Sequence, residues 1–212
     1  MEEQVRIDYH DNGQISQRCI LQNNQLHGKA TFYNEMGQLT QELQFENNVL
    51  NGIGLMYDEE SNLSQALSFK EGVLEGESCF YEEGILNSKI NYKNGKQEGL
   101  SIFYHENGLV KMLSEYKKGK LDGDMMIYSE EGILMRRSFY QEGLLEKVSY
   151  DYYPDGKMVR QLTTFLKGKQ EGETISYFTD GQMARICYFR NGKQVAEIEY
   201  DQHGNERHRE GI

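Results

Sequence analysis

The sequence predicts an all-β protein, an elongated, twisted antiparallel β-meander built from hairpin repeats of about 24 residues. Three observations carry this prediction. Glycines recur at three positions along nearly the whole chain, aromatic residues recur in two rows, and the segments between glycines alternate in polarity. Alternation with period two is typical of strands, and regular self-similarity is typical of repeat architectures.

The repeats open on a glycine at nearly constant spacing, with one exception. The opening residues are Gly28, Gly52, Gly76, Gly99, Gly123, Lys147 and Gly172, at intervals of 24, 24, 23, 24, 24 and 25 residues. We expect the opening glycines to leave room for a neighbouring aromatic ring against bare backbone. Lys147 and the extra residue before Phe165 predict a local irregularity near residues 147–165.

Two kinds of turn divide each repeat. The first turns, such as YNEMG and YHENG, end in glycine, where a left-handed residue lets a short hairpin close. The only proline supports this register, because Pro154 in Tyr153-Pro154-Asp155-Gly156 suits the second position of a type I turn. The second turns, such as KNGKQEG, reverse the chain again, which predicts about 17 strands.

Aromatic rows replace a conventional core in this interpretation. One row contains Tyr33, Tyr57, Tyr81, Tyr104, Tyr128, Tyr152 and Tyr177, and the other contains Phe45, Phe69, Tyr92, Tyr116, Tyr140, Phe165 and Phe189. Cys19 and Cys187 occupy positions held elsewhere by aliphatic residues, so we expect them to be small buried residues, with a reactive thiol as the alternative.

Composition and charge exclude several classes of function. The chain has no run of about 20 apolar residues and no basic, apolar leader, so we expect a cytoplasmic protein without a membrane partner. The net charge of −11 disfavours nucleic acid and anionic lipid as partners. Three cysteines without metal-type spacing favour neither a disulfide framework nor a zinc site.

A family resemblance follows from the repeated pattern Y-x-x-G-K-x-x-G-x-x-x-x-Y-x-x-x-G, seen as YKNGKQEGLSIFYHENG and YKKGKLDGDMMIYSEEG. The pattern resembles the MORN-repeat variant of bacterial YwqK-type antitoxin proteins, over roughly residues 5–204. The resemblance implies β-hairpin arrays and the protective half of a toxin–antitoxin or effector–immunity pair. The paired G-x-G of eukaryotic MORN repeats occurs only at Gly52 and Gly54, so the lipid-binding and scaffold roles of those proteins carry over less well.

No motif for catalysis, metal binding or cofactor binding stands out. Five Gly-Lys pairs lack the following Ser or Thr of a phosphate-binding loop, and the repeat accounts for them. The five histidines form no HExxH or Ser/His/Asp grouping. We therefore expect no enzyme activity, no cofactor and no metal site.

The distribution of charge suggests a binding surface. Thirteen carboxylates lie in or beside the first turns; because the whole chain carries a net charge of −11, the remaining residues sum to +2 and these turns account for essentially all of the net charge. Alternate turns of a meander emerge on opposite edges, which predicts one acidic edge and one nearly neutral edge rich in lysine. The simplest interpretation is that charged turns keep a long sheet soluble. The alternative is that the acidic edge attracts a basic partner. The candidate contact carboxylates are Asp58, Glu59, Glu60, Glu82, Glu83, Glu106, Glu130 and Glu131.

A second candidate surface is the sheet face opposite the regular Leu/Phe stripe. This face is polar in the early repeats and apolar later, where it carries Met135, Phe139, Ile186 and Tyr188. Packing or self-association is one explanation and partner docking the other.

The sequence thus predicts one repeat domain over residues 1–204 and a short charged tail over residues 205–212. The predicted function is a non-enzymatic immunity or antitoxin protein that binds and neutralises a basic bacterial toxin or secreted effector. The alternatives are a repeat scaffold, with or without membrane association, and an enzyme accessory domain. The partner and the oligomeric state, a homo-oligomer included, stay open.

Overall fold

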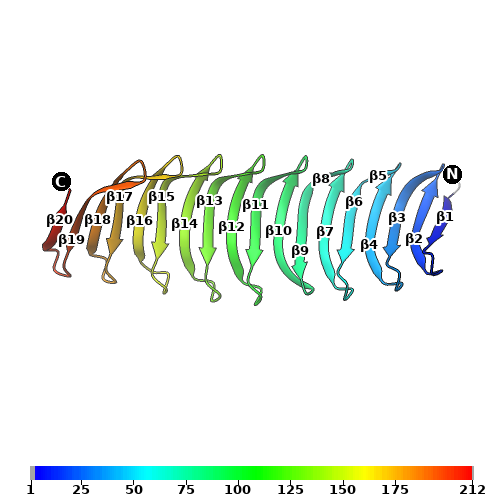
Figure 1. Cartoon of the computed structure of the whole chain (residues 1–212), viewed down its shortest axis with the longest axis horizontal. Helices are drawn as coiled ribbons and strands as arrows, with labels where there is room; N and C mark the ends of the chain where they lie inside the picture. The colour runs from blue at the N-terminus through cyan, green and yellow to red at the C-terminus, as the bar shows by residue number, and fades with distance from the viewer. Residues whose placement is uncertain (1–2, 212) are drawn as a thin grey trace. The chain divides into compact units, whose positions relative to one another are not determined.

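The computed structural model describes residues 3–211, and these form twenty β-strands with no helix. The chain divides into two compact units, one ending at Ser101 and one beginning at Ile102. In each unit, consecutive strands pair antiparallel as a meander (Figure 1). The predicted all-β class and antiparallel hairpin repeats are confirmed.

The strands of the first unit are β1 (Glu3–Tyr9), β2 (Ile15–Gln22), β3 (Gln25–Tyr33), β4 (Leu39–Glu46), β5 (Val49–Leu50), β6 (Gly52–Tyr57), β7 (Leu63–Lys70), β8 (Val73–Leu74), β9 (Gly76–Glu82) and β10 (Ile85–Lys93). Strand β11 (Lys96–Tyr104) contains the boundary between the units. Those of the second unit are β12 (Val110–Lys117), β13 (Lys120–Tyr128), β14 (Leu134–Gln141), β15 (Leu144–Tyr152), β16 (Val159–Leu166), β17 (Lys169–Tyr177), β18 (Met183–Arg190), β19 (Lys193–Tyr200) and β20 (Glu206–Glu210).

The sequence predicted about 17 strands, and the difference has two causes. Two predicted strands are interrupted, at Asn51 between β5 and β6 and at Glu75 between β8 and β9. In addition, the residues expected to form a charged tail include β20, which pairs antiparallel with β19.

The second turns are tight two-residue turns. Both residues of each turn have positive φ, as in Asn23 (51°) with Asn24 (61°) and Asn94 (49°) with Gly95 (73°). Two successive left-handed residues define the type I′ turn, whose twist matches that of the flanking strands. Asparagine and glycine tolerate this conformation best, which explains the repeated Asn-Asn, Asn-Gly and Lys-Gly pairs.

The first turns combine a type I turn with a left-handed glycine. In the turn at His105, Gly108 N donates to His105 O (2.9 Å) and His105 N donates to Leu109 O (2.8 Å). Pro154 occupies the predicted second position of such a turn, since Gly156 N donates to Tyr153 O (2.8 Å). The predicted chemistry of these turns is therefore confirmed.

Variation in repeat length is absorbed at the first turn. The paired residues that flank it are usually six positions apart, as in Tyr33 and Leu39. In the 23-residue repeat the first turn shrinks to the two residues Glu83 and Gly84, both with positive φ. In the 25-residue repeat the gap grows to seven positions, from Tyr152 to Val159. The predicted irregularity near residues 147–165 is thus a longer turn at its centre.

The opening glycines are required by backbone conformation. Gly52, Gly123 and Gly172 have φ of 112°, 132° and 86°, beside register shifts in the pairing with the preceding strand. Six of the opening residues pair across strands with an aromatic residue, for example Gly28 with Phe45. The expected steric reason is wrong, however: a Cβ at Gly28 or Gly123 would meet Ile20 or Glu115 rather than a ring.

Lys147 adopts the same left-handed conformation as the opening glycines, with φ of 60°. Its Nζ lies 3.7 Å from the centroid of the Phe139 ring. A cation over an aromatic face is attracted by the ring quadrupole, which offsets part of the cost of a left-handed lysine.

A row of small residues runs along the middle of the sheet in each unit, one per strand, and we call it the central row. Cross-strand pairs connect Arg6, Cys19, Ala30 and Leu43 in the first unit. In the second unit they connect Ser149, Thr163, Thr174, Cys187, Glu197 and Glu210. The predicted burial of Cys19 and Cys187 is confirmed, at 3% and 7% exposure.

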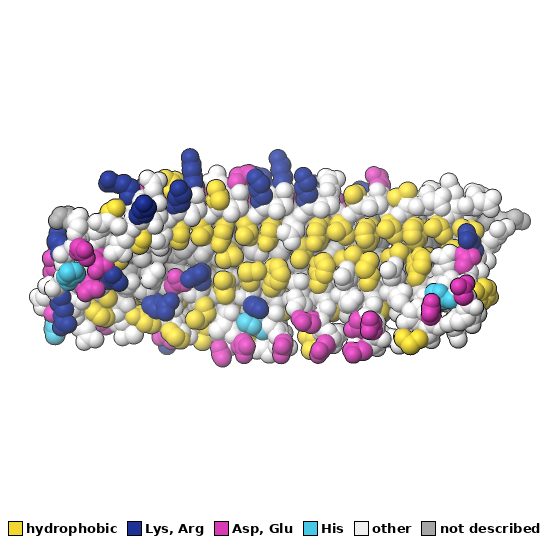
Figure 2. Space-filling model, in the orientation of Figure 1, with side chains coloured by type: hydrophobic (Ala, Val, Ile, Leu, Met, Phe, Trp, Pro, Cys, Tyr) yellow, Lys and Arg dark blue, Asp and Glu magenta, His cyan; other side chains and the backbone are white. Residues whose placement is uncertain are grey.

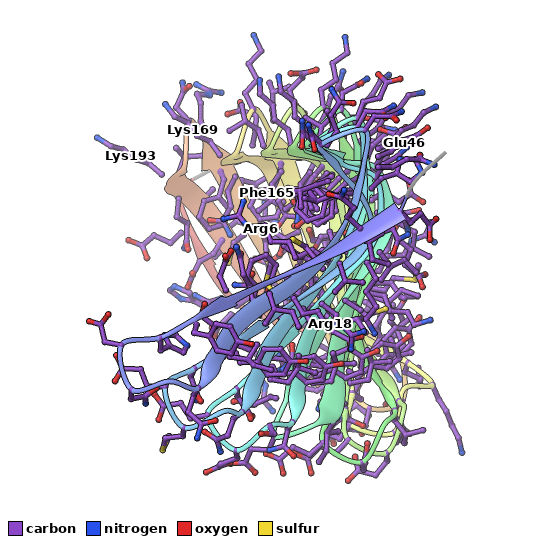
Figure 3. All side chains as sticks on the ribbon, turned by 90° about the vertical axis from the view of Figure 1, so that its right-hand side faces the viewer. Arg6, Arg18, Glu46, Phe165, Lys169 and Lys193 are labelled. Carbon is purple, nitrogen blue, oxygen red and sulfur yellow. The ribbon has the colours of Figure 1, made fainter. Side chains whose placement is uncertain are left out.

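The two predicted aromatic rows are half-buried throughout. Viewed along the array, rings stack one behind another, with Phe165 in one of these stacks (Figure 3). Such stacking buries aromatic surface within a single sheet layer, which compensates for the absence of a second layer over the described residues.

Candidate functional site

The predicted acidic edge exists within each unit. Glu59, Glu60, Glu82 and Glu83 in the first unit and Glu106, Glu130 and Glu131 in the second are exposed at or beside first turns. Carboxylates gather along the margin formed by these turns (Figure 2). Seven of the eight predicted contact carboxylates are therefore accessible to a partner.

Asp58 is the exception, because its carboxylate serves its own turn. Its Oδ1 accepts hydrogen bonds from the backbone N–H groups of Glu60 (3.0 Å) and Asn62 (2.8 Å). The residue is half-buried. Asp201 makes the equivalent two contacts in the first turn between β19 and β20, where it accepts hydrogen bonds from the backbone N–H groups of His203 and Asn205 (2.9 Å each). Asp58 is thus a turn-stabilising residue of the Asx type.

Hydrogen bonds tie one first turn to the next along the acidic edge. Asn12 Nδ2 donates to Glu35 O (2.7 Å), and Asn107 Nδ2 donates to Glu130 O (2.7 Å). Tyr153 Oη donates to Tyr177 O (2.6 Å) in the same manner. These bonds fix the backbone that carries the carboxylates, so the edge presents its charges in a fixed arrangement within each unit.

The second turns of the second unit carry mainly cations. Seven cations and four carboxylates lie there: Lys117, Lys118, Lys120, Lys167, Lys169, Arg190 and Lys193 against Asp122, Glu142, Glu146 and Glu171. All four of these carboxylates bond locally, as where Lys120 Nζ lies 2.9 Å from Glu142 and Glu171 accepts a hydrogen bond from Asn191 N (2.6 Å). Lys and Arg project along this margin, opposite the acidic one (Figure 2).

The four predicted apolar contact residues do not form one cluster. Phe139, Ile186 and Tyr188 are half-buried and alternate with buried central-row neighbours, so they lie on the other face of the sheet. Met135 sits at the register shift between Leu134 and Arg136 and lines a separate hollow. A strand bulge re-aims a side chain, which period-two counting cannot anticipate.

Ile186 belongs to an apolar ladder that sequence reasoning found only in part. Cross-strand pairs connect Tyr150 with Leu162, Leu162 with Ile175, Ile175 with Ile186, and Ile186 with Ile198. The signal was present, since each residue lies next to a central-row position in its strand. We call these five residues the apolar ladder.

The corresponding ladder of the first unit is polar at its start. Arg18 pairs with Thr31, and Thr31 pairs with Glu42. Arg6 and Arg18 point to opposite sides of their strands (Figure 3). As predicted, this face is polar at the start of the first unit and apolar along the ladder of the second.

A hollow of about 260 Å³ lies in the second unit beside the longest first turn. Its walls are Ile127, Met135, Arg136, Asp151, Tyr152, Pro154 and Arg160. Arg136 Nε donates to Asp151 Oδ1 (2.5 Å), and this bond raises the pKa of the Arg136 guanidinium. The Arg136 guanidinium and the Asp151 carboxylate pair with one another, and Arg160 adds a second cation to the lining.

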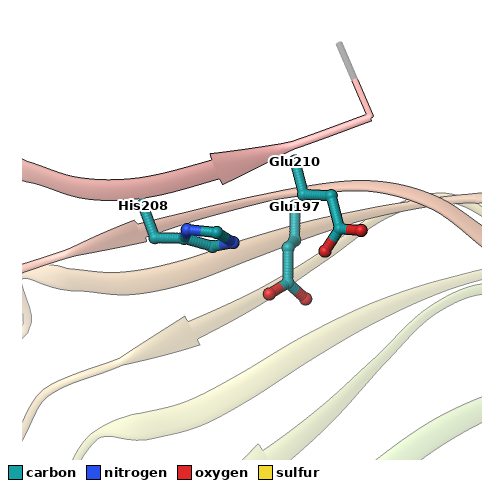
Figure 4. Close-up of side chains that lie close together, drawn as sticks. All are labelled: Glu197, His208 and Glu210. Atoms are coloured by element: carbon teal, nitrogen blue, oxygen red, sulfur yellow. The ribbon is translucent and has the colours of Figure 1, made fainter.

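One group of potential metal ligands occurs among residues 3–211. Donor atoms of Glu197, His208 and Glu210, from β19 and β20, lie within 4.8 Å of one another (Figure 4). The Glu197 carboxylate, however, is already engaged, because it accepts hydrogen bonds from Arg185 and from Gln194 Nε2 (2.6 Å). The bond from Arg185 lowers the pKa of Glu197. A cation would have to displace this guanidinium.

Burial raises the pKa of the Cys19, Cys79 and Cys187 thiols. A higher pKa leaves less thiolate at neutral pH, which weakens nucleophilic reactivity. The alternative of a reactive thiol is therefore disfavoured at these three positions.

Comparison with known protein families identifies the repeats. The MORN repeat variant matches residues 26–47, 74–94, 97–118 and 170–191. Four segments of the chain are thus similar to the MORN repeat variant. All four matched segments are strand-turn-strand segments centred on a first turn, between β3 and β4, β9 and β10, β11 and β12, and β17 and β18, and each ends at the first residue of a type I′ second turn (47, 94, 118 and 191).

Comparison with individual proteins adds little. No curated protein matches the sequence. One solved structure, the crystal structure of TcdB2-TccC3-Cdc42, is 12% identical with a TM-score of 0.20; the match covers 94% of this chain and only 12% of that one. A porin-like protein from Bacteroides uniformis ATCC 8492 is 11% identical over 91% of each chain, with a TM-score of 0.22. Among the described residues, no helix is long and apolar enough to cross a membrane.

Proposed function

We propose that the chain is a non-enzymatic protein-binding repeat protein of the antitoxin or immunity kind, acting in the cytoplasm on a basic toxin or effector. The observation that carries the proposal is the row of exposed carboxylates on the first turns, held by hydrogen bonds from turn to turn. The MORN repeats support a binding role. The antitoxin role rests on the resemblance of the repeat pattern to the YwqK-type proteins.

Electrostatic attraction supplies the first step of this proposed function. A row of like charges raises the local concentration of an oppositely charged partner and speeds its association. A toxin that acts on nucleic acid has a basic substrate site, because phosphate binding requires cations. The acidic edge would occupy that site in place of the phosphate backbone, so no bond need be made or broken.

Apolar contacts would supply most of the affinity. Exposed ion pairs are individually weak, whereas buried aromatic and aliphatic side chains dominate binding energies. Phe139, Ile186 and Tyr188 are half-buried and remain partly accessible. Their proposed role is to hold a partner that the carboxylates have attracted.

The decisive experiment has two stages. Co-expression with toxins encoded next to this gene should restore growth for the cognate toxin, and purified protein should then bind it directly. The triple variant Glu59→Lys, Glu82→Lys, Glu130→Lys should slow association roughly tenfold or more at low salt and flatten its salt dependence. Dissociation should change less, because rim charges act mainly on the association rate.

A matched control separates the edge from the total charge. Glu46→Lys, Glu71→Lys, Glu142→Lys changes the net charge equally, but at the second turns. The control should retain most of the association rate. Equal rates for both triple variants would show that net charge alone matters and would remove the proposed role of the acidic edge.

A scaffold for protein assembly is the second candidate, favoured by the apolar ladder on the other face of the second unit. A scaffold binds several proteins at once and protects against no toxin. Failure of every neighbouring toxin to be neutralised, with several proteins retained through Phe139 and Ile186, would favour it.

A further inference from the structure

Strand β1 of the first unit and strand β20 of the second carry opposite charges at the central-row position. Arg6 occupies the central-row position of β1, where it pairs with Cys19. Glu197 and Glu210 occupy it in β19 and β20. Most other members of the row are Ser, Thr, Cys or Ala. A charged residue therefore replaces a small one at both ends.

Both strands are edges within their own units. Among residues 3–211, β1 pairs only with β2, and β20 pairs only with β19. Each leaves one row of backbone N–H and C=O groups without a strand partner, and such rows are templates for pairing with another chain. Val5 and Ile7 of β1 are 55% and 38% exposed.

The repeat defines which residues would meet if one edge continued into the other. Strand β20 pairs with β19 as β2 pairs with β1, since Tyr200 pairs with Glu206 as Tyr9 pairs with Ile15. Strand β3 in turn is the equivalent of β1, because Tyr33 holds the position of Tyr9. The β2–β3 pairing can therefore be transferred to β20 and a second β1.

In that register, Gln17 pairs with Phe32 and Cys19 pairs with Ala30. The equivalent pairs are His208 with Asp8 and Glu210 with Arg6. Each pair brings together groups of opposite or complementary charge. The position equivalent to the His208–Asp8 pair already holds an ion pair inside the second unit, where Arg136 of β14 contacts Asp151 of β15 at 2.5 Å.

We propose that copies of the chain associate end to end, with β20 of one copy pairing antiparallel with β1 of the next in the register of β2 and β3. The partner is thus a second copy of this chain. Such an interface is heterologous, so it continues from copy to copy. It is independent of the toxin-binding proposal, because it uses neither the first-turn carboxylates nor the apolar ladder.

Charge selects this pairing over others. The residues of β20 are Glu-Arg-His-Arg-Glu, all exposed. Charged edge strands normally prevent association with other strands. Here the charges disfavour pairing with any strand that lacks complementary charges at the opposite positions. Arg6 and Asp8 now bond to each other, with Arg6 Nη2 3.0 Å from Asp8, so association exchanges an exposed ion pair for cross-strand pairs. The contact is small, and we expect it to be weak.

Sedimentation of the 212-residue protein from about 10 to 500 µM, in low and high salt, tests the proposal. The average mass should rise above 24.7 kDa with concentration and fall back as salt increases. Arg6→Glu and Glu210→Arg should each raise the concentration needed for association roughly tenfold or more. Glu106→Arg, an equally exposed charge reversal in a first turn, should not.

Mixing the variants distinguishes end-to-end pairing from its alternatives. An equimolar mixture of the two single variants should associate, since Glu210 of one meets Arg6 of the other. The double variant, with both charges exchanged, should also associate. Both residues are exposed, so the variants are expected to fold.

Three results would overturn the proposal. A wild-type protein that stays monomeric over the whole range would show that the charged edges only prevent association. Undiminished association of Glu210→Arg alone would point to pairing of two β1 strands. Failure of the mixture and of the double variant to recover association would show that Arg6 and Glu210 do not meet.

Discussion

Two opening glycines of the second unit allow a quantitative test of why glycine recurs there. Gly172 has φ of 86°, and a Cβ at this position would lie 3.9 Å from Thr164, an ordinary contact. Gly123 has φ of 132°, and a Cβ there would lie 2.8 Å from the Cβ of Glu115. The Glu115 Cβ is fixed to its backbone, so rotation of the side chain cannot relieve this approach.

The expected costs differ because Gly123 combines two effects. Gly172→Ala should lower the free energy of unfolding by about 1–2 kcal/mol, the cost of a left-handed alanine. Gly123→Ala should lose a similar amount through the backbone and about 1–3 kcal/mol more through the steric contact. We therefore expect Gly123→Ala to be the more destabilising substitution by at least about 1 kcal/mol.

Urea unfolding followed by circular dichroism measures both variants against the wild type. The slope m must stay constant for the comparison, because repeat proteins can unfold in parts. Equal losses for both variants would show that backbone conformation alone explains the glycines. No loss for either would refute the assigned left-handed conformation.

Three further predictions concern polar groups of the central row. Ser114 is fully buried and its hydroxyl has no hydrogen-bond partner among residues 3–211, so Ser114→Ala should raise the free energy of unfolding by about 1 kcal/mol. Ser149→Ala removes the hydrogen bond from Ser149 to Ser138 (3.0 Å) and should lower the free energy of unfolding by about 1 kcal/mol. Urea unfolding measures both changes. The pKa of Glu197 is lowered in the folded protein by its bond from Arg185, so its stabilising effect is present above the ordinary glutamate pKa of 4.5 and is lost as pH falls through the lowered value. Glu197→Gln should therefore flatten the acid end of the stability profile; an unchanged profile below pH 4.5 would contradict this.

The sequence predicted local structure where one residue type decides the backbone. The left-handed turn glycines and the single proline left few alternatives, and both turn types appear where the pattern placed them. The prediction failed for Met135, because a bulge in β14 turns its side chain into the hollow with Arg136. Asp58 differs from the other candidate contact carboxylates in a way that spacing could not show, because its two backbone donors become visible only in the closed turn.

The sequence alone determined the repeat, its strands and the segregation of charge between alternating turns, because these depend on spacing along the chain. Only the tertiary structure decided which residues become neighbours across strands. The register joined Tyr150, Leu162, Ile175, Ile186 and Ile198 into one ladder and set Arg6 and Glu210 at the ends of the central row. The reason is physical: a bulge displaces pairing by a residue or two, and such displacements, repeated at every hairpin, cannot be counted from polarity alone.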